Sequence, residues 1–113
     1  MEREPLRAYQ LDRLNRLLSR ILPANPFFAR RLAHLSLPLK SLDELTHIPL
    51  TTKDDLVAAD AGQLPPNRTY PESEYARLHR TSGTRGGPLA ILDTVEDWQW
   101  WIDTWQYVLD AGQ

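Results

Sequence analysis

Residues 81–87, a short run of hydroxyl residues and glycines, have the composition needed to bind a phosphate group. They read Thr-Ser-Gly-Thr-Arg-Gly-Gly and lie between two segments of β-prone residues. Glycine permits a positive φ and a close approach of the backbone to a ligand, and successive N–H groups then form an anion-binding nest. Neither GxxxxGK[ST] nor GxGxxG fits this spacing. On composition alone, an ordinary glycine-rich hairpin connection is the commoner case.

Further segments on both sides of the loop extend the pattern over most of the chain. Thr81 to Pro88 resembles the (S/T)SGTTGxP phosphate loop of adenylate-forming ligases, and His79 is similar to a histidine in the branch that contains phenylacetate–CoA ligase. Asn25 to Arg31 resembles that branch's PFYRR segment, and residues 41–56 resemble its SLEDL…LPFTTKEDL. Because the segments occur in the family's order, the resemblance favours an ATP-phosphate site over the hairpin connection.

The resemblance implies an acyl–CoA ligase that joins a carboxylic acid, expected to be aromatic, to ATP and then to CoA, with Mg²⁺ shielding the phosphates. It implies that His79 supports the loop and that the loop holds the β- and γ-phosphates through Thr81, Ser82, Gly83, Thr84, Arg85, Gly86 and Gly87. Two positions depart from the family pattern. The family often has threonine at the position of Arg85, and lysine or another basic residue at the position of Gly87. Arg85 either restores the missing positive charge or faces solvent, and the sequence leaves both open.

Members of this family are several times longer than 113 residues, so the resemblance implies that the chain is only part of an α/β enzyme. Residues 1–113 would form the front of the large N-terminal, AMP-binding-type domain, with a helical lead-in at 1–60 and a strand–loop–strand–helix unit at 74–113. No catalytic residue is assigned, and we expect this segment alone to be inactive. The alternative is a short non-catalytic interaction or oligomerisation module, which would self-associate through uncovered apolar faces.

Composition narrows the remaining function classes. A net charge of −2 and a pI near 5.9 give no reason to expect a nucleic-acid partner. With no cysteine, the chain has no disulfide framework or cysteine-based metal site, and no metal ligand is assigned. No secretory signal and no apolar run of membrane-spanning length is visible, so we expect a cytoplasmic protein without a membrane partner.

Hydrophobic periodicity and capping residues predict the elements that position the loop. We expect an amphipathic helix over 6–22, a short helix from Asn25 and Pro26, and short helices over 42–46 and 53–59. An irregular stretch over 60–73 precedes strands over 75–80 and 89–93. Thr94 with Asp97 caps a final helix to about Ala111, and Gly112 ends it.

The buried side of these elements is predicted to contain large apolar residues from both halves of the chain. We expect the first helices to pack beside the strand–loop–strand unit, with the following residues largely buried: Phe27, Phe28, Leu32, Leu56, Trp98, Trp101 and Trp105. Trp100 points away from this stripe, and would pack on an element outside the chain or form an aromatic wall for the acid. The loop itself is predicted to be exposed and mobile.

Overall fold

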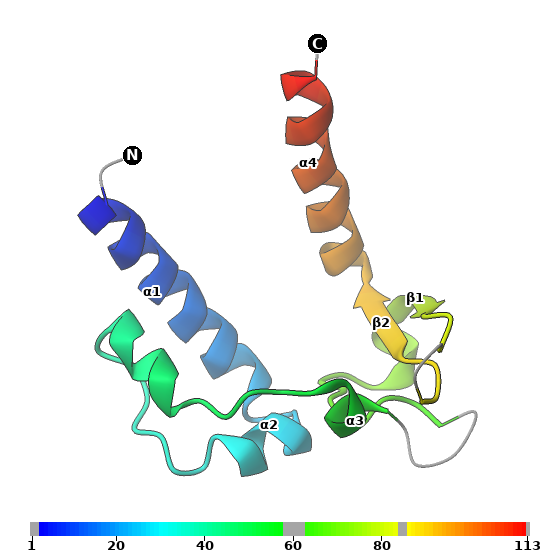
Figure 1. The fold of residues 1–113 in the computed structure, drawn as a ribbon, viewed down its shortest axis with the longest axis horizontal. Coiled ribbons are helices and arrows are strands. Elements are labelled where there is room, and N and C mark those ends of the chain that lie inside the picture. The colour runs from blue at the N-terminus through cyan, green and yellow to red at the C-terminus, as the bar shows by residue number, and fades with distance from the viewer. Residues whose placement is uncertain (1–2, 58–62, 84–85, 113) are drawn as a thin grey trace. The chain divides into compact units, whose positions relative to one another are not determined.

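The computed structural model describes residues 3–57, 63–83 and 86–112, which combine helices with one two-stranded antiparallel sheet (Figure 1). The elements in order are α1 (Arg3–Ile21), α2 (Pro26–Arg31), the 3₁₀ helix η1 (Leu42–His47), α3 (Lys53–Leu56), the 3₁₀ helix η2 (Glu72–Glu74), β1 (Tyr75–Arg80), β2 (Ala90–Thr94) and α4 (Val95–Ala111). The chain divides into two compact units, Met1–Asp55 with Asn67–Thr69, and Leu56–Pro66 with Tyr70–Gln113. The mixed α/β class expected from the sequence is confirmed, and the arrangement of an adenylate-forming domain stays a prediction.

The first unit is built on the apolar stripe of α1, which begins three residues earlier than predicted, with Pro5 in its first turn. Leu18, Leu32 and Leu39 form its buried centre. The partly buried side chains around them come from α1, α2 and the segments that follow, namely Leu11, Leu14, Leu22, Phe28, Leu35 and Ile48. Burial of one such leucine side chain contributes about 1.5–3 kcal/mol, so this small cluster is the main apolar contribution to the unit.

Asn25 joins the start of α2 to a distant part of the same unit. Its side-chain oxygen accepts a hydrogen bond from the Phe28 N–H at 3.1 Å, which caps the helix as predicted. Its Nδ2 donates to the Asn67 carbonyl at 2.7 Å and to the Thr69 hydroxyl at 3.0 Å. Asn25 is only 1% exposed, and these bonds satisfy a buried amide that would otherwise be costly.

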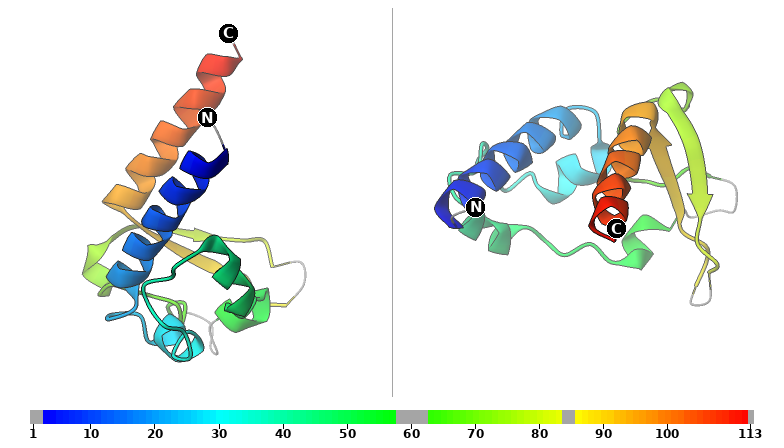
Figure 2. Two further views of the ribbon diagram at one scale, coloured as in Figure 1. Left: turned by 90° about the vertical axis from the view of Figure 1, so that its left-hand side faces the viewer. Right: turned by 90° about the horizontal axis from the view of Figure 1, so that it is seen from above.

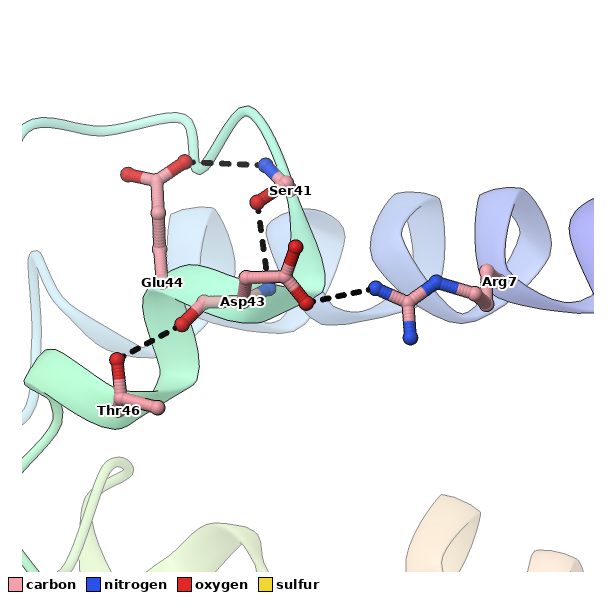
Figure 3. Close-up of polar contacts among 5 residues, drawn as sticks. All are labelled: Arg7, Ser41, Asp43, Glu44 and Thr46. Carbon is pink, nitrogen blue, oxygen red and sulfur yellow. Dashed lines mark hydrogen bonds and ion pairs between the residues drawn. The ribbon is translucent and has the colours of Figure 1, made fainter.

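A capping box starts η1, as the Ser41 and Glu44 spacing predicts (Figure 3). The Asp43 N–H donates to the Ser41 hydroxyl at 3.2 Å, and the Ser41 N–H donates to the Glu44 carboxylate at 3.0 Å. The segment is a 3₁₀ helix, a form that is usual for runs of this length. Arg7 of α1 donates to the Asp43 carboxylate at 2.8 Å and so connects the two helices across the surface of the unit.

Asp55 closes the first turn of α3 in the same way. Its Oδ2 accepts from the Thr52 N–H at 2.7 Å and from the Thr52 hydroxyl at 2.9 Å, while Arg31 Nη1 lies 3.5 Å from Oδ1. The hydrogen bond from the Thr52 backbone, followed by that from its hydroxyl, lowers the pKa of Asp55 below its ordinary value of 3.8. The predicted helix over 53–59 is confirmed for 53–56 and is wrong at Val57, which is not helical. Residues 58 and 59 lie outside the described ones.

The second unit is a hairpin that continues directly into α4 (Figure 2). In the pairing of β1 with β2, Arg77 lies opposite Asp93, His79 opposite Ile91, and Leu78 opposite Leu92. Directly paired residues share a face, so Arg77, His79, Ile91 and Asp93 point to one side. Thr94 then starts α4: the Asp97 N–H donates to its hydroxyl at 3.2 Å, and its own N–H donates to the Asp97 carboxylate at 3.0 Å.

The predicted burial of the tryptophan stripe on α4 is wrong. Trp101 is 47% exposed and Trp105 is 49% exposed, because the contacts of α4 with the strands are confined to the start of the helix. Phe27 and Leu32 are buried as predicted, whereas Phe28, Leu56 and Trp98 are only partly buried. Packing of the first helices beside the hairpin stays a prediction.

Two further observations concern the helices. Gly112 ends α4, with its N–H donating to the Leu109 carbonyl at 3.2 Å, but its φ of −89° is not the left-handed conformation typical of a glycine terminator. Within the described ranges, no helix combines the length and apolar character needed to cross a membrane.

Candidate functional site

The glycine-rich loop leaves β1 after Arg80 and enters β2 at Ala90, and its two ends are joined at a narrow neck. The Thr81 N–H donates to the Leu89 carbonyl at 3.0 Å, and the Leu89 N–H donates to the Thr81 hydroxyl at 2.9 Å. The Thr81 hydroxyl thus acts as an acceptor within the loop, and its own proton can still be donated to a ligand. These two hydrogen bonds join Thr81 to Leu89 directly beyond the ends of the two strands.

Two loop glycines, Gly83 and Gly86, have backbone conformations that other residues rarely adopt. Both have a left-handed backbone, with φ of 71° and 72°. A Cβ on Gly83 would lie 3.0 Å from the Pro88 nitrogen and 3.2 Å from its Cα, so a side chain at this position would crowd the Pro88 backbone. Among the described residues, no heavy atom lies within 4 Å of the corresponding point at Gly86, where the left-handed backbone conformation favours glycine. Left-handed residues within a loop are the geometry that turns successive N–H groups toward an anion.

Gly87 is different from the other two loop glycines because it lacks a positive φ. A Cβ there would lie 3.5 Å from Val57 Cγ1, an ordinary van der Waals distance. A Cβ at this position is therefore compatible with the described residues around it. Neither the backbone conformation nor the space at Cβ requires glycine at position 87.

The other loop residues are accessible to a ligand where the structure describes them. Thr81, Ser82, Gly86 and Gly87 are exposed, which confirms the predicted exposure for these four, whereas Gly83 is partly buried. Thr84 and Arg85 lie outside the described residues, so their predicted contacts with phosphate stay predictions. The predicted mobility of the loop is likewise untested.

A cluster of charged and aromatic side chains lies on the face of the hairpin beneath the loop. The imidazole of His79 stacks on the indole of Trp98, with ring centroids 5.4 Å apart and planes at 20°. His79 Nε2 lies 3.2 Å from Asp93 Oδ2, and the Arg77 guanidinium carbon lies 4.2 Å from the centroid of the Trp98 ring.

The sequence interpretation placed His79 before the loop but missed Asp93 and Trp98 as its partners. A signal was present, since Arg77 and His79 are two apart on one strand and therefore share a face. The Thr94 cap also fixes Trp98 in the first turn of α4, directly after β2. A hollow of about 380 Å³ is lined by three residues of this cluster, His79, Asp93 and Trp98, together with Ile91, Asp97, Trp100 and Trp101.

Three relatives with a curated name match most of this sequence, and each is named phenylacetate-coenzyme A ligase. The protein from Thermus thermophilus is 36% identical over 100 residues, which cover 86% of this chain and 22% of that protein. Those from Pseudomonas putida and Aromatoleum evansii are each 32% identical over 114 and 110 residues, covering 94% of this chain and 23% of each protein. By sequence, the chain is similar to part of the phenylacetate–coenzyme A ligases.

The resemblance inferred from the loop and its flanking segments is thereby confirmed. No protein-family model matches the chain. The chain spans about a fifth of the length of the phenylacetate–coenzyme A ligases that it matches. The match with the Thermus thermophilus protein leaves 14% of this chain uncovered. Residues 81–87 lie further than that from either end of the chain, so the matched stretch includes the glycine-rich loop.

Proposed function

We propose that this chain supplies the ATP phosphate-binding loop of an adenylate-forming acid–CoA ligase. The observation that carries the proposal is the pair of left-handed glycines, Gly83 and Gly86, in a loop closed by Thr81 and Leu89. A glycine-rich loop of this kind offers N–H groups to phosphate oxygens, as an anion nest does. Its occurrence in a relative of phenylacetate–coenzyme A ligases favours a nucleotide over other anions.

In the proposed reaction, the carboxylate of an aromatic acid attacks the α-phosphorus of ATP. The bond between the α- and β-phosphates breaks, pyrophosphate leaves, and an acyl-adenylate forms. The thiol of CoA then attacks the acyl carbon and AMP leaves. Mg²⁺ is the expected counter-ion of the triphosphate. The relatives' names support phenylacetate or a similar aryl acid as the first substrate to test.

The part of the loop in this reaction is to hold the leaving pyrophosphate group. Backbone N–H groups and the hydroxyls of Thr81, Ser82 and Thr84 would donate to the β- and γ-phosphates. Arg85 is the one positive residue in the sequence between Thr81 and Leu89, and would offset the charge that develops as pyrophosphate departs. Such a loop accelerates the reaction by positioning and charge stabilisation, without covalent chemistry of its own.

Pyrophosphate release tests the proposal. The full-length protein that contains this segment is assayed with phenylacetate and other aryl acids, in the presence of ATP, Mg²⁺ and CoA. We expect acid-dependent release from the full-length protein and none from the 113-residue chain alone. Release by the short chain would contradict its predicted inactivity, and no release by the longer protein with any acid would argue against a ligase.

A second candidate function is supported by the outer face of α4. Trp101, Ile102, Trp105 and Leu109 are each between 46% and 59% exposed, although they form an amphipathic stripe of the kind that normally packs. A short interaction or oligomerisation module would use this stripe to bind a second copy. Sedimentation of the 113-residue chain over a range of concentrations distinguishes the two candidates. An interaction module is expected to form one defined oligomer, and Trp105→Glu is expected to prevent its formation.

A further inference from the structure

The hairpin that carries the loop needs support from outside its two strands. A two-stranded hairpin is marginally stable in water unless it packs on another element. Every residue of β1 after Tyr75 is exposed, including Leu78 at 48%. Among the described residues, α4 is the helix that packs against both strands. The orientation of the loop therefore depends on the contact between α4 and the hairpin.

That contact is centred on one side chain. Within Val95–Ala111, Trp98 alone is partly buried and all other residues are exposed. Its indole stacks on His79 and lies under the Arg77 guanidinium, so it contacts two residues of β1 on the same face. Because Trp98 also lies in the capped first turn of α4, its position is fixed relative to the end of β2.

His79 transmits this contact to the loop. It lies two residues before Thr81, whose N–H and hydroxyl close the neck with Leu89. Asp93, on the neighbouring strand, lies 3.2 Å from His79 Nε2 and holds the imidazole from the side of β2. The stack on Trp98 and the contact with Asp93 therefore hold His79 from two sides, two residues before the neck of the loop.

We propose that Trp98 is a positioning residue for the phosphate loop, acting through its stack on His79. The side chain clamps β1 onto the start of α4 and so sets the direction in which residues 81–89 leave the hairpin. The consequence for catalysis rests on the proposed function, because misplacement of a binding group by about 1 Å can cost as much as 10²-fold in rate. The clamp itself is a property of the hairpin and can be measured without ATP.

The test compares three variants in the full-length protein. Trp98→Leu removes the aromatic face but keeps an apolar side chain, so that the protein still folds. Trp98→Phe keeps a ring that can stack. Trp105→Leu is the matched control, because Trp105 lies on the same helix and its ring contact among the described residues is with Trp101.

The first measurement is amide hydrogen exchange at the neck of the loop. We expect Trp98→Leu to speed exchange of the Thr81 and Leu89 N–H groups by about threefold to tenfold, the change that corresponds to one aromatic stacking contact. Trp98→Phe restores most of the protection, and Trp105→Leu leaves it unchanged. Equal exchange in all variants, or the same acceleration in Trp105→Leu, would overturn the proposal.

The second measurement separates loop positioning from general stability. In steady-state kinetics, Trp98→Leu should raise KM for ATP by a similar factor with KM for the acid unchanged, and Trp98→Phe should recover it. An equal rise of both KM values contradicts a role in loop positioning. If the wild-type protein does not use ATP, the proposed function fails, and a selective change in exchange at Thr81 and Leu89 still supports the clamp.

Discussion

At the scale of single residues, the charge of the loop is concentrated on one side chain. Arg85 is the only cation between Thr81 and Leu89, and Gly87 lacks the basic side chain that the resemblance leads one to expect. Among the described residues, a Cβ at Gly87 would meet Val57 Cγ1 at 3.5 Å, an ordinary van der Waals distance. A basic residue can therefore be introduced at position 87 to test whether charge there replaces that of Arg85.

Replacement of Arg85 by alanine tests whether this charge acts on ATP. We expect Arg85→Ala to raise KM for ATP in the full-length enzyme by an amount equivalent to about 1.5–3 kcal/mol, the value of one charge-assisted hydrogen bond. Binding of the acid should be nearly unchanged. Gly87→Lys in the Arg85→Ala background should recover part of the loss. An Arg85→Ala enzyme with unchanged ATP dependence would mean that Arg85 faces water.

Asn25 is the buried polar side chain among the described residues of the first unit, and we expect the stability of the unit to depend on its hydrogen bonds. Asn25→Ala removes the cap of α2 and leaves partly buried partners at Phe28 and Asn67 without their hydrogen bonds. We expect a loss of about 2–3 kcal/mol in the free energy of unfolding. Thr46→Ala, which removes an exposed hydroxyl bond to Asp43, is the control and should cost about 0.5 kcal/mol or less. Urea unfolding measures both, and equal losses would contradict the assigned role of Asn25.

At the scale of the elements, short-range polar patterns were predictable and contacts between elements were not. Ser41 with Glu44 and Thr94 with Asp97 were correctly identified as caps because each bond joins residues within one turn. The strand positions were predicted to within one residue for a similar reason. The contact of Trp98 with His79 depends on the register of the hairpin and on the angle of α4, neither of which is encoded in local spacing.

The Asp55 carboxylate at the start of α3 predicts a specific dependence of stability on pH. Its pKa is lowered, so the unfolded chain binds its proton more readily than the folded one. The stabilisation is therefore present at neutral pH and is lost as pH falls through the folded pKa, below 3.8. Asp55→Asn should be less stable than wild type at neutral pH, and the two should converge in acid.

Urea unfolding at neutral pH and at acidic pH checks this expectation for Asp55. Asp54→Asn is the matched control, because it removes one negative charge from the exposed neighbouring residue. A stability difference between Asp55→Asn and wild type that stays constant from neutral to acidic pH would show that the Thr52 bonds do not favour the charged carboxylate.

At the scale of the whole molecule, the burial of α4 is where sequence reasoning was wrong. The 3.6-residue spacing of Trp98, Trp101 and Trp105 correctly identified one face, but a periodic pattern does not specify what covers that face. Trp98 meets the hairpin, whereas Trp101 and Trp105 are about half exposed. The position of the loop between the strands was easier to predict, because Gly83 and Gly86 meet a local backbone requirement.

The central claim is that residues 81–87 hold ATP phosphate, and a graded series of glycine variants tests it most directly. Acid-dependent exchange of labelled pyrophosphate into ATP is measured in the full-length protein. Gly86→Ala introduces only backbone strain of about 1–2 kcal/mol and should slow exchange by about fivefold to thirtyfold. Gly83→Ala adds a collision with Pro88 and should slow it further, while Gly112→Ala, outside the loop, should have no effect. Exchange at the wild-type rate in both loop variants would contradict the claim.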